Sequence, residues 1–245
     1  MQTASSVIGG SGLDWGVVGN LLVALFTLLL AVVAVFQQQI HRWLRRPILR
    51  ISTTNEPPDS HKTALTIRKG DQSTSSYGCY YSLLRVENAG RLRAEQVEVF
   101  VSEILREEAL GKWVPLKNFL PQRLLWSFER TPYLASLAPG TFAHCTLGHV
   151  LHPSGRQEAS GEDPNQTDFW GKHVVTENET VFSLDVQFRS NNLSYLLIPG
   201  KYRLRVLLAS SQTKALTAEI LVDLSGNWFD EEDQMLNKGI TIEVR

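Results

Sequence analysis

The amino-acid sequence predicts an N-terminal single transmembrane α-helix followed by a mainly antiparallel, all-β domain. The run from Gly16 to Phe36 contains no ionisable residue, which is typical of a membrane span. After Pro47, short segments of alternating apolar and polar residues follow one another, and helical periodicity is nearly absent. The predicted organisation is a short polar tail (1–14), a transmembrane helix with a basic juxtamembrane end (15–46) and a β-sandwich domain (47–245).

The apolar run GVVGNLLVALFTLLLAVVAVF is long enough to cross a bilayer, because about 20 residues of helix rise roughly 30 Å. Trp15 and Trp43 flank the run about 42 Å apart along a helix, close to the distance between the two headgroup regions. A cleaved signal peptide and a soluble core helix are the two alternatives to a membrane span. A cleaved signal peptide would begin with a basic segment, and no Lys or Arg precedes Arg42. A soluble core helix would carry a polar stripe, which is absent here.

Basic residues predict the direction of the span. Four arginines follow the run, and the residues before it include Asp14 but no basic side chain. Because Lys and Arg are retained on the cytoplasmic side, we expect a cell-membrane protein, plasma or inner, with the N-terminus outside and the β domain in the cytoplasm. Gly12 and Gly16 have the spacing of a small-residue contact, which suggests a homo-oligomer formed through the helix. The predicted membrane-interface residues are Trp15, Arg42, Trp43, Arg45 and Arg46.

About ten short strands separated by turn residues predict a single β-sandwich domain. In AEQVEVFVSEI, Val97, Val99 and Val101 fall on one face of a strand, and the turn signal NAG precedes this strand. The segment NWFDEEDQMLNK predicts one or two helical turns beginning near Asp230. The expected strands lie within 47–53, 63–68, 77–87, 94–104, 112–116, 123–128, 141–147, 181–188, 200–209, 215–224 and 239–244.

Two segments carry a fold-level resemblance. LLRVENAGRLRAEQVEVFV (83–101) and IPGKYRLRVLL (198–208) resemble immunoglobulin-like and adhesion-type β-sandwich modules. The resemblance implies an Ig-like β-sandwich behind the membrane anchor and implies no activity. The sequence departs from antibody domains because no Trp follows Cys79 before Trp113, and because Ala143 stands where a corner tyrosine would precede Cys145.

Composition and motifs argue against several functions. The 24 basic and 25 acidic residues are balanced, so we expect no nucleic-acid partner. The chain lacks a phosphate-binding glycine loop, a nucleophile elbow and a paired-carboxylate motif, so we expect no catalytic residue and no cofactor. His144, His149 and His152 suggest a metal-dependent enzyme as the weakest alternative. On a regular strand, however, His144 and His149 point to opposite faces unless a bulge or turn intervenes near Gly148, so no metal site is expected.

The status of two cysteines and three sequons depends on topology. Cys79 and Cys145 lie in predicted strands, and they are expected to be reduced in a cytoplasmic domain but available for a disulfide in an exported one. Asn165, Asn178 and Asn192 begin N-x-S/T sequons, which require a lumenal domain to be modified. The predicted topology leaves all of them unmodified.

Two aromatic pairs are candidate partner contacts. Phe169 and Trp170 lie in a long polar loop expected at 152–179, and connections of this length are often functional or disordered. Trp228 and Phe229 lie near the C-terminus, and either pair has the alternative of covering its own core. The sequence therefore predicts a non-catalytic, membrane-anchored module that binds or scaffolds another protein at the cytoplasmic face. The alternative is an exported sandwich that binds an extracellular or periplasmic ligand.

Overall fold

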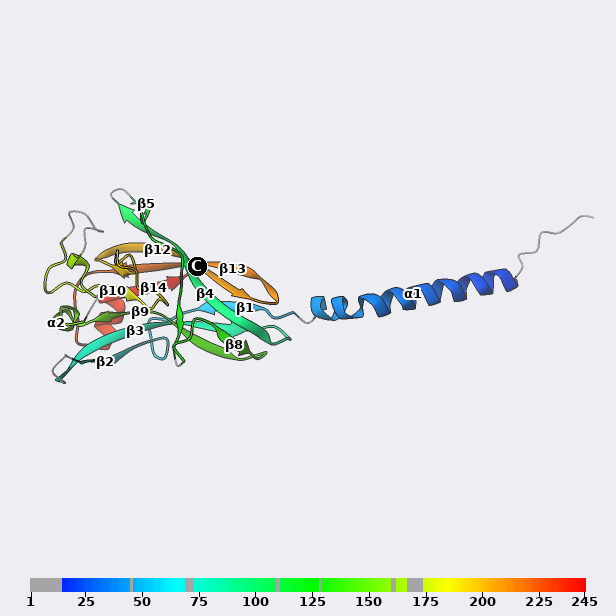
Figure 1. The fold of residues 1–245 in the computed structure, drawn as a ribbon, viewed down its shortest axis with the longest axis horizontal. Helices are drawn as coiled ribbons and strands as arrows, with labels where there is room; N and C mark the ends of the chain where they lie inside the picture. Colours follow the sequence, from blue (N-terminus) through cyan, green and yellow to red (C-terminus); the bar gives the residue numbers. More distant parts are fainter. Residues whose placement is uncertain are drawn as a thin grey trace, which may run out of the picture. The chain divides into compact units, whose positions relative to one another are not determined.

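A computed structural model of the protein describes residues 15–44, 46–68, 73–108, 111–127, 129–159, 162–166 and 174–245, with the side chains of 38–44 and 166 excepted. The chain divides into two compact units, residues 1–45 and residues 46–245. The first contains one long helix, and the second is built of strands (Figure 1). The predicted fold class, an N-terminal helix followed by an antiparallel all-β domain, is confirmed in outline.

Helix α1 spans Trp15–Leu44, and its segment Trp15–Gln37 is long and apolar enough to cross a membrane. The side chains of that segment are not buried against the rest of the described chain. Thr27 satisfies its own hydroxyl by donating to the Val23 carbonyl at 2.8 Å. Among the predicted interface residues, Trp15 and Arg46 are exposed. The side chains of Arg42 and Trp43 and all of Arg45 lie outside the described part, as does Gly12 of the predicted helix contact.

The β unit contains two antiparallel sheets. The first sheet has the order β1-β3-β9-β10-β11, with β2 also paired to β3 and β7 also paired to β9. Its strands are β1 (Leu49–Ser52), β2 (Ser60–Arg68), β3 (Thr74–Asn88), β7 (Leu125–Trp126), β9 (Phe142–Leu151), β10 (Phe182–Leu184) and β11 (Leu196–Leu197).

The second sheet has the order β14-β13-β12-β4-β5, with β6 and β8 also paired to β4. Its strands are β4 (Ala94–Glu108), β5 (Lys112–Pro115), β6 (Gln122–Arg123), β8 (Leu134–Leu137), β12 (Gly200–Ser210), β13 (Thr213–Leu224) and β14 (Ile240–Val244). The short helical segments of the unit are α2 (Pro153–Arg156), η2 (Pro164–Gln166), α3 (Glu232–Gln234) and η4 (Met235–Gly239).

One hydrophobic core lies between the sheets. Strand β4 contributes Val97, Val99 and Val101, all fully buried as their alternation predicts, and β3 contributes Tyr80 and Leu84. Because side chains alternate along a strand, Tyr81 and Leu83 point to the opposite, outer face of the first sheet. That outer face carries the candidate site described below.

Tyr202, near the start of β12, forms a hydrogen bond with the turn that precedes this strand. Tyr202 is fully buried, and its hydroxyl donates to the Ile198 carbonyl at 2.8 Å. Burial raises the pKa of this phenol, so the hydroxyl keeps its proton and remains a donor. The contact holds the turn before β12 against the core.

Tyr202→Phe is expected to lower the free energy of unfolding by about 1 to 2 kcal/mol, because the Ile198 carbonyl loses its donor while the ring packing remains. Urea titration of the full chain in detergent measures the change. The matched variant Tyr133→Phe removes a hydroxyl from a half-exposed ring and is expected to have little effect. Equal losses in the two variants would contradict a structural role for the Tyr202 hydroxyl.

Asn88, the first residue of the NAG turn, fixes the first residues of the β unit. Asn88 is fully buried, and its Oδ1 accepts hydrogen bonds from the backbone of Ile48 at 3.3 Å and Gly90 at 3.0 Å. Its Nδ2 donates to the carbonyls of Leu92 at 2.7 Å and Leu137 at 3.0 Å. Residues 46–48 are therefore held on the loop between β3 and β4.

The two cysteines lie on opposite faces of the first sheet. Cys145 belongs to the core between the sheets, whereas Cys79 packs in a small outer cluster with Leu151 and Ala159. Cys79 pairs with Leu151 across the β3–β9 ladder, six residues from Cys145, or roughly 20 Å along the strand. A disulfide needs Cα atoms within about 7 Å, so this fold excludes the Cys79–Cys145 bond expected for an exported domain. Both thiols are free, and burial raises the pKa of each.

Candidate functional site

A cavity of about 560 Å³ opens on the outer face of the first sheet. Its walls come from β2, β3, β7 and β9, from the loop before β2, and from the segments around Arg130 and Asp185. Its lining contains both apolar and polar side chains. The lining residues are Pro57, Pro58, His61, Thr63, Tyr81, Leu83, Leu125, Trp126, Ser127, Arg130, His144, Thr146 and Asp185.

A bulge in β9 brings two histidines to this face. Ser82 pairs with Gly148 and Leu83 pairs with Thr146, so β9 contains one extra residue, Leu147, at this point of the ladder. The extra residue shifts the alternation of β9, and His144 and His149 then lie on the same side of the sheet. A regular strand would have placed them on opposite faces. The bulge is therefore the local feature that assembles the polar wall.

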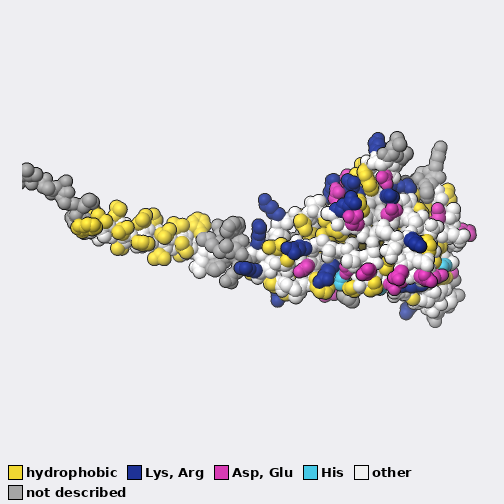
Figure 2. Space-filling view, turned by 180° about the vertical axis from the view of Figure 1, so that it is seen from behind, with side chains coloured by type: hydrophobic (Ala, Val, Ile, Leu, Met, Phe, Trp, Pro, Cys, Tyr) yellow, Lys and Arg dark blue, Asp and Glu magenta, His cyan; other side chains and the backbone are white. Residues whose placement is uncertain are grey.

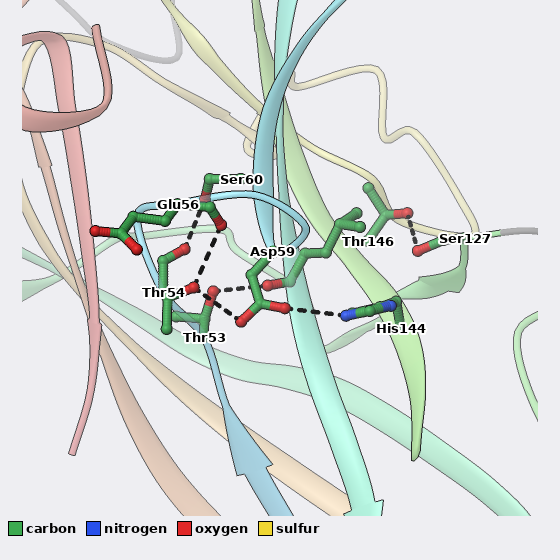
Figure 3. A network of polar contacts seen from close by, with 9 residues as sticks. Thr53, Thr54, Glu56, Asp59, Ser60, Ser127, His144 and Thr146 are labelled. Carbon is green, nitrogen blue, oxygen red and sulfur yellow. Dashed lines mark hydrogen bonds and ion pairs between the residues drawn. The ribbon is translucent and has the colours of Figure 1, made fainter. Parts of the chain in front are cut away.

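The first histidine forms a buried pair with Asp59. His144 Nε2 lies 3.0 Å from Asp59 Oδ1, and both side chains are nearly buried. The other carboxylate oxygen of Asp59 accepts a hydrogen bond from Thr54 Oγ1 at 3.1 Å. Figure 3 shows that Asp59 lies in the loop before β2 and points toward His144 on β9. The pair therefore joins two segments that are 85 positions apart in the chain.

The same loop is held by a set of short polar contacts. Ser60 Oγ donates to the Thr54 carbonyl at 2.9 Å, and Thr53 Oγ1 donates to the Leu83 carbonyl at 2.7 Å (Figure 3). The backbone N–H of Leu83 donates in turn to the Asp59 carbonyl at 2.7 Å. These contacts fix the loop on β3, so the position of the Asp59 carboxylate is set before any ligand arrives.

The second histidine forms a similar pair with Asp185. His149 Nδ1 lies 3.3 Å from Asp185 Oδ2, and both side chains are nearly buried. The Tyr81 ring lies between this pair and His61, with ring centroids 5.1 Å from His149 and 6.3 Å from His61. Burial raises the pKa of Tyr81 to about 12, although the positive charge of Arg130 acts in the opposite direction. Tyr81 is therefore a neutral phenol at physiological pH.

The remaining wall contributes hydroxyl groups and an indole. Thr146 Oγ1 donates to Ser127 Oγ at 3.0 Å, a contact visible in Figure 3. Trp126 is buried beside them, and within the described part of the chain its indole N–H has no hydrogen-bond partner. An unsatisfied buried donor costs about 1 to 3 kcal/mol, so this group favours a site that receives an acceptor from outside.

The three histidines singled out by the sequence have different surroundings. On this face, His144 Nε2 and His149 Nδ1 each contact a carboxylate rather than a hydroxyl or thiol nucleophile. His152 lies apart from the other two histidines, because its Nδ1 accepts the Ser154 N–H at the start of α2 and its ring meets the edge of Trp228. Across the described residues, no three His, Cys, Asp or Glu side chains gather closely enough to hold a metal ion.

The predicted partner contacts differ from this site. Trp228 packs on Tyr80 with ring centroids 5.0 Å apart, and Phe229 is half-buried against the main core. Phe169 and Trp170 fall within 167–173, outside the described residues, so their role stays a prediction. Within the described parts of the 152–179 loop, Asn165 exchanges two hydrogen bonds with the Val175 backbone, at 2.7 and 3.0 Å.

Sequence reasoning missed the cavity and most of its residues. Asp59, Tyr81, Arg130 and Asp185 are far apart in the chain, and none belongs to a recognisable motif. The one available signal was the histidine spacing around Gly148, where a glycine inside a strand pattern indicates a bulge. The chain matches no protein-family model, no curated protein and no solved structure in comparisons with each of these groups.

Proposed function

We propose that the chain is a single-pass, membrane-anchored, non-catalytic recognition module whose β domain binds a protein segment in the outer-face cavity. The buried His144–Asp59 and His149–Asp185 pairs carry this proposal. Burying charged or polar pairs contributes little net stability compared with apolar packing of the same volume. Two such pairs beside one cavity therefore favour a site maintained for ligand recognition.

The size and chemistry of the cavity suit part of a peptide chain. Its volume of about 560 Å³ falls within the range of small-ligand sites. Proline and leucine side chains provide apolar contact, whereas Ser127, Thr146 and Arg130 provide polar groups for backbone or side-chain recognition. An aromatic or aliphatic side chain of a partner, followed by polar backbone, matches this combination.

A cross-linking experiment tests the proposed site. Benzoylphenylalanine is placed at Thr63, which lines the cavity, or at Thr66, which is exposed on the opposite face of the same strand. Irradiation of membranes that contain the full chain is expected to give a discrete protein adduct from position 63 only. With the partner identified from that adduct, Thr63→Trp is expected to weaken its binding more than tenfold by filling the cavity, whereas Thr66→Trp leaves it unchanged. Identical adducts from both positions would contradict a specific site.

We propose that the domain lies on the cytoplasmic side, as the arginines after the span predict. Residues 45–48 separate α1 from β1, so the proposed span would tether this domain to the membrane. Leu120→Cys provides a topology reporter, because Leu120 is exposed and both native thiols are buried. An impermeant maleimide is expected to label this cysteine only after the cells are permeabilised. Labelling of intact cells would instead support the exported alternative.

The exported alternative has less support from the geometry. Its disulfide is excluded, and two of its three sequons use their side-chain amides internally. Asn165 Nδ2 donates to the Val175 carbonyl, and Asn192 Nδ2 donates to the Asn118 carbonyl. Asn165 and Asn178 are both exposed, but only the side chain of Asn178 makes no hydrogen bond with the described residues.

We also propose that the two sheets form an Ig-like sandwich. The Tyr202 hydroxyl bonded to the backbone four residues upstream has the geometry of the tyrosine corner of such folds. It lies in the IPGKYRLRVLL segment, which carries part of the sequence resemblance.

A further inference from the structure

A basic surface lies at the end of the β domain where the chain continues toward α1. Figure 2 shows Lys and Arg side chains gathered at that end of the domain. Arg46 and Arg91 are brought together there, because the Arg91 N–H donates to the Arg46 carbonyl at 3.4 Å. Arg93 follows two residues later, and all three side chains are exposed. We call residues 46, 48 and 91–93 the juxtamembrane surface.

The juxtamembrane surface has positive charge that the described residues do not neutralise. No ion pair involves Arg46, Arg91 or Arg93 within the described chain. Two carboxylates lie near this end. Glu87 is opposite Arg50 in the β1–β3 ladder, and Glu95 accepts a hydrogen bond from Gln212. Neither carboxylate forms an ion pair with the three arginines within the described chain, so their charge is open to an external anion.

Two exposed apolar side chains belong to the same surface as these arginines. Ile48 is 45 % exposed and Leu92 is 37 % exposed, and Leu92 lies between two arginines in the sequence Arg-Leu-Arg. Basic and apolar side chains in one small surface are typical of segments that bind the interface of an anionic membrane.

The backbone of this surface is rigid. Asn88 holds the Gly90 N–H and the Leu92 carbonyl, and the Ala89 N–H donates to the Ile48 carbonyl at 2.8 Å. A side chain at position 90 would meet the backbone of residues 46–48 at 2.4 to 2.6 Å, so glycine allows the two segments to touch. A loop ordered in advance loses little conformational entropy on binding.

We propose that the juxtamembrane surface is a second membrane-contact site that binds anionic phospholipid headgroups, with Leu92 and Ile48 entering the interface and the arginines contacting phosphates. The position of this surface along the chain indicates which anion it binds. The surface begins two residues after α1, whose apolar segment is long enough to span a bilayer, so lipid headgroups are the anions present at highest local concentration. The contact orients the domain and therefore the entrance of its cavity.

The full chain in lipid nanodiscs tests this site. Leu92→Cys is labelled with an environment-sensitive fluorophore, because the native thiols are buried. Its emission is expected to shift to shorter wavelength in discs of phosphatidylcholine and phosphatidylserine relative to phosphatidylcholine alone. The matched label at Leu120→Cys, an exposed leucine in the connection between β5 and β6, is expected to show no shift.

Removal of positive charge from the juxtamembrane surface provides a second test. The double substitution Arg91→Gln and Arg93→Gln is expected to lower the ratio of membrane-bound to unbound juxtamembrane surface, measured from the emission of the Leu92→Cys label, roughly 25-fold. This corresponds to about fivefold for each arginine near an anionic leaflet. Lys112→Gln with Lys117→Gln, two exposed cations along and after β5, is expected to leave the ratio unchanged.

An emission spectrum that is the same in both lipid mixtures would overturn the proposal and would favour an acidic protein segment as the ligand of this surface. A shift that survives removal of both arginines would also overturn it. Because the discs present both leaflets with the same composition, neither result depends on the topology or on the cavity.

Discussion

Gly148→Ala is expected to destabilise the β domain by about 3 kcal/mol or more, through steric overlap in the centre of the first sheet. A Cβ atom at this position would lie 2.3 Å from the Ser183 carbonyl oxygen and 2.8 Å from two atoms of the Phe182 ring. Phe182 is fully buried, and Ser183 pairs with β9, so neither has room to move. Urea titration of the full chain in detergent, followed by tryptophan fluorescence, measures the loss.

The appropriate control is Gly140→Ala. Gly140 has a φ of +70° but no atom within 4 Å of an added Cβ, so its substitution costs only the backbone strain of about 1 kcal/mol. Comparable losses of unfolding free energy in the two variants would show that the bulge in β9 accommodates a methyl group.

The same substitution is expected to damage the cavity. Gly148 pairs with Leu184, the neighbour of Asp185, and it precedes His149. Widening the β9–β10 ladder here separates the His149–Asp185 pair, so the adduct from benzoylphenylalanine at Thr63 should be lost even under conditions where the variant remains folded. Retention of that adduct would indicate that the cavity does not need this pair.

Asn88→Ala is expected to lower the free energy of unfolding by about 3 to 5 kcal/mol, because it removes four hydrogen bonds from a fully buried position and leaves their partners unsatisfied. Residues 46–48 should also detach from the loop between β3 and β4. Hydrogen exchange of the full chain measures this, with faster exchange expected at the Ile48 and Ala89 amides.

Asn227→Ala is the matched control, because Asn227 is exposed and its side chain makes no hydrogen bond with the described residues. It is expected to match the unsubstituted protein in both stability and exchange. If Asn88→Ala destabilises the domain without faster exchange at Ile48, then other contacts hold residues 46–48 on the loop between β3 and β4. Asn88 would in that case stabilise only the core.

Local patterns in the sequence predicted the elements whose formation depends on local chemistry. The long apolar run predicted α1, because the run alone decides whether a helix is suited to a bilayer. The alternating valines of β4 predicted a strand and its buried face. The acidic segment near the C-terminus predicted a short helix, which the structure places at Glu232–Gly239, two residues later than expected.

The sequence by itself therefore determined that a long apolar helix precedes a two-sheet β domain, because hydrophobic periodicity is a property of neighbouring residues. Only the tertiary structure decided which residues form the candidate site. Asp59 meets His144, and Asp185 meets His149, through strand register and one extra residue in β9. It also placed Cys79 and Cys145 on opposite faces of one sheet. Register depends on contacts between distant segments, and a shift of one residue reverses the face of every side chain that follows.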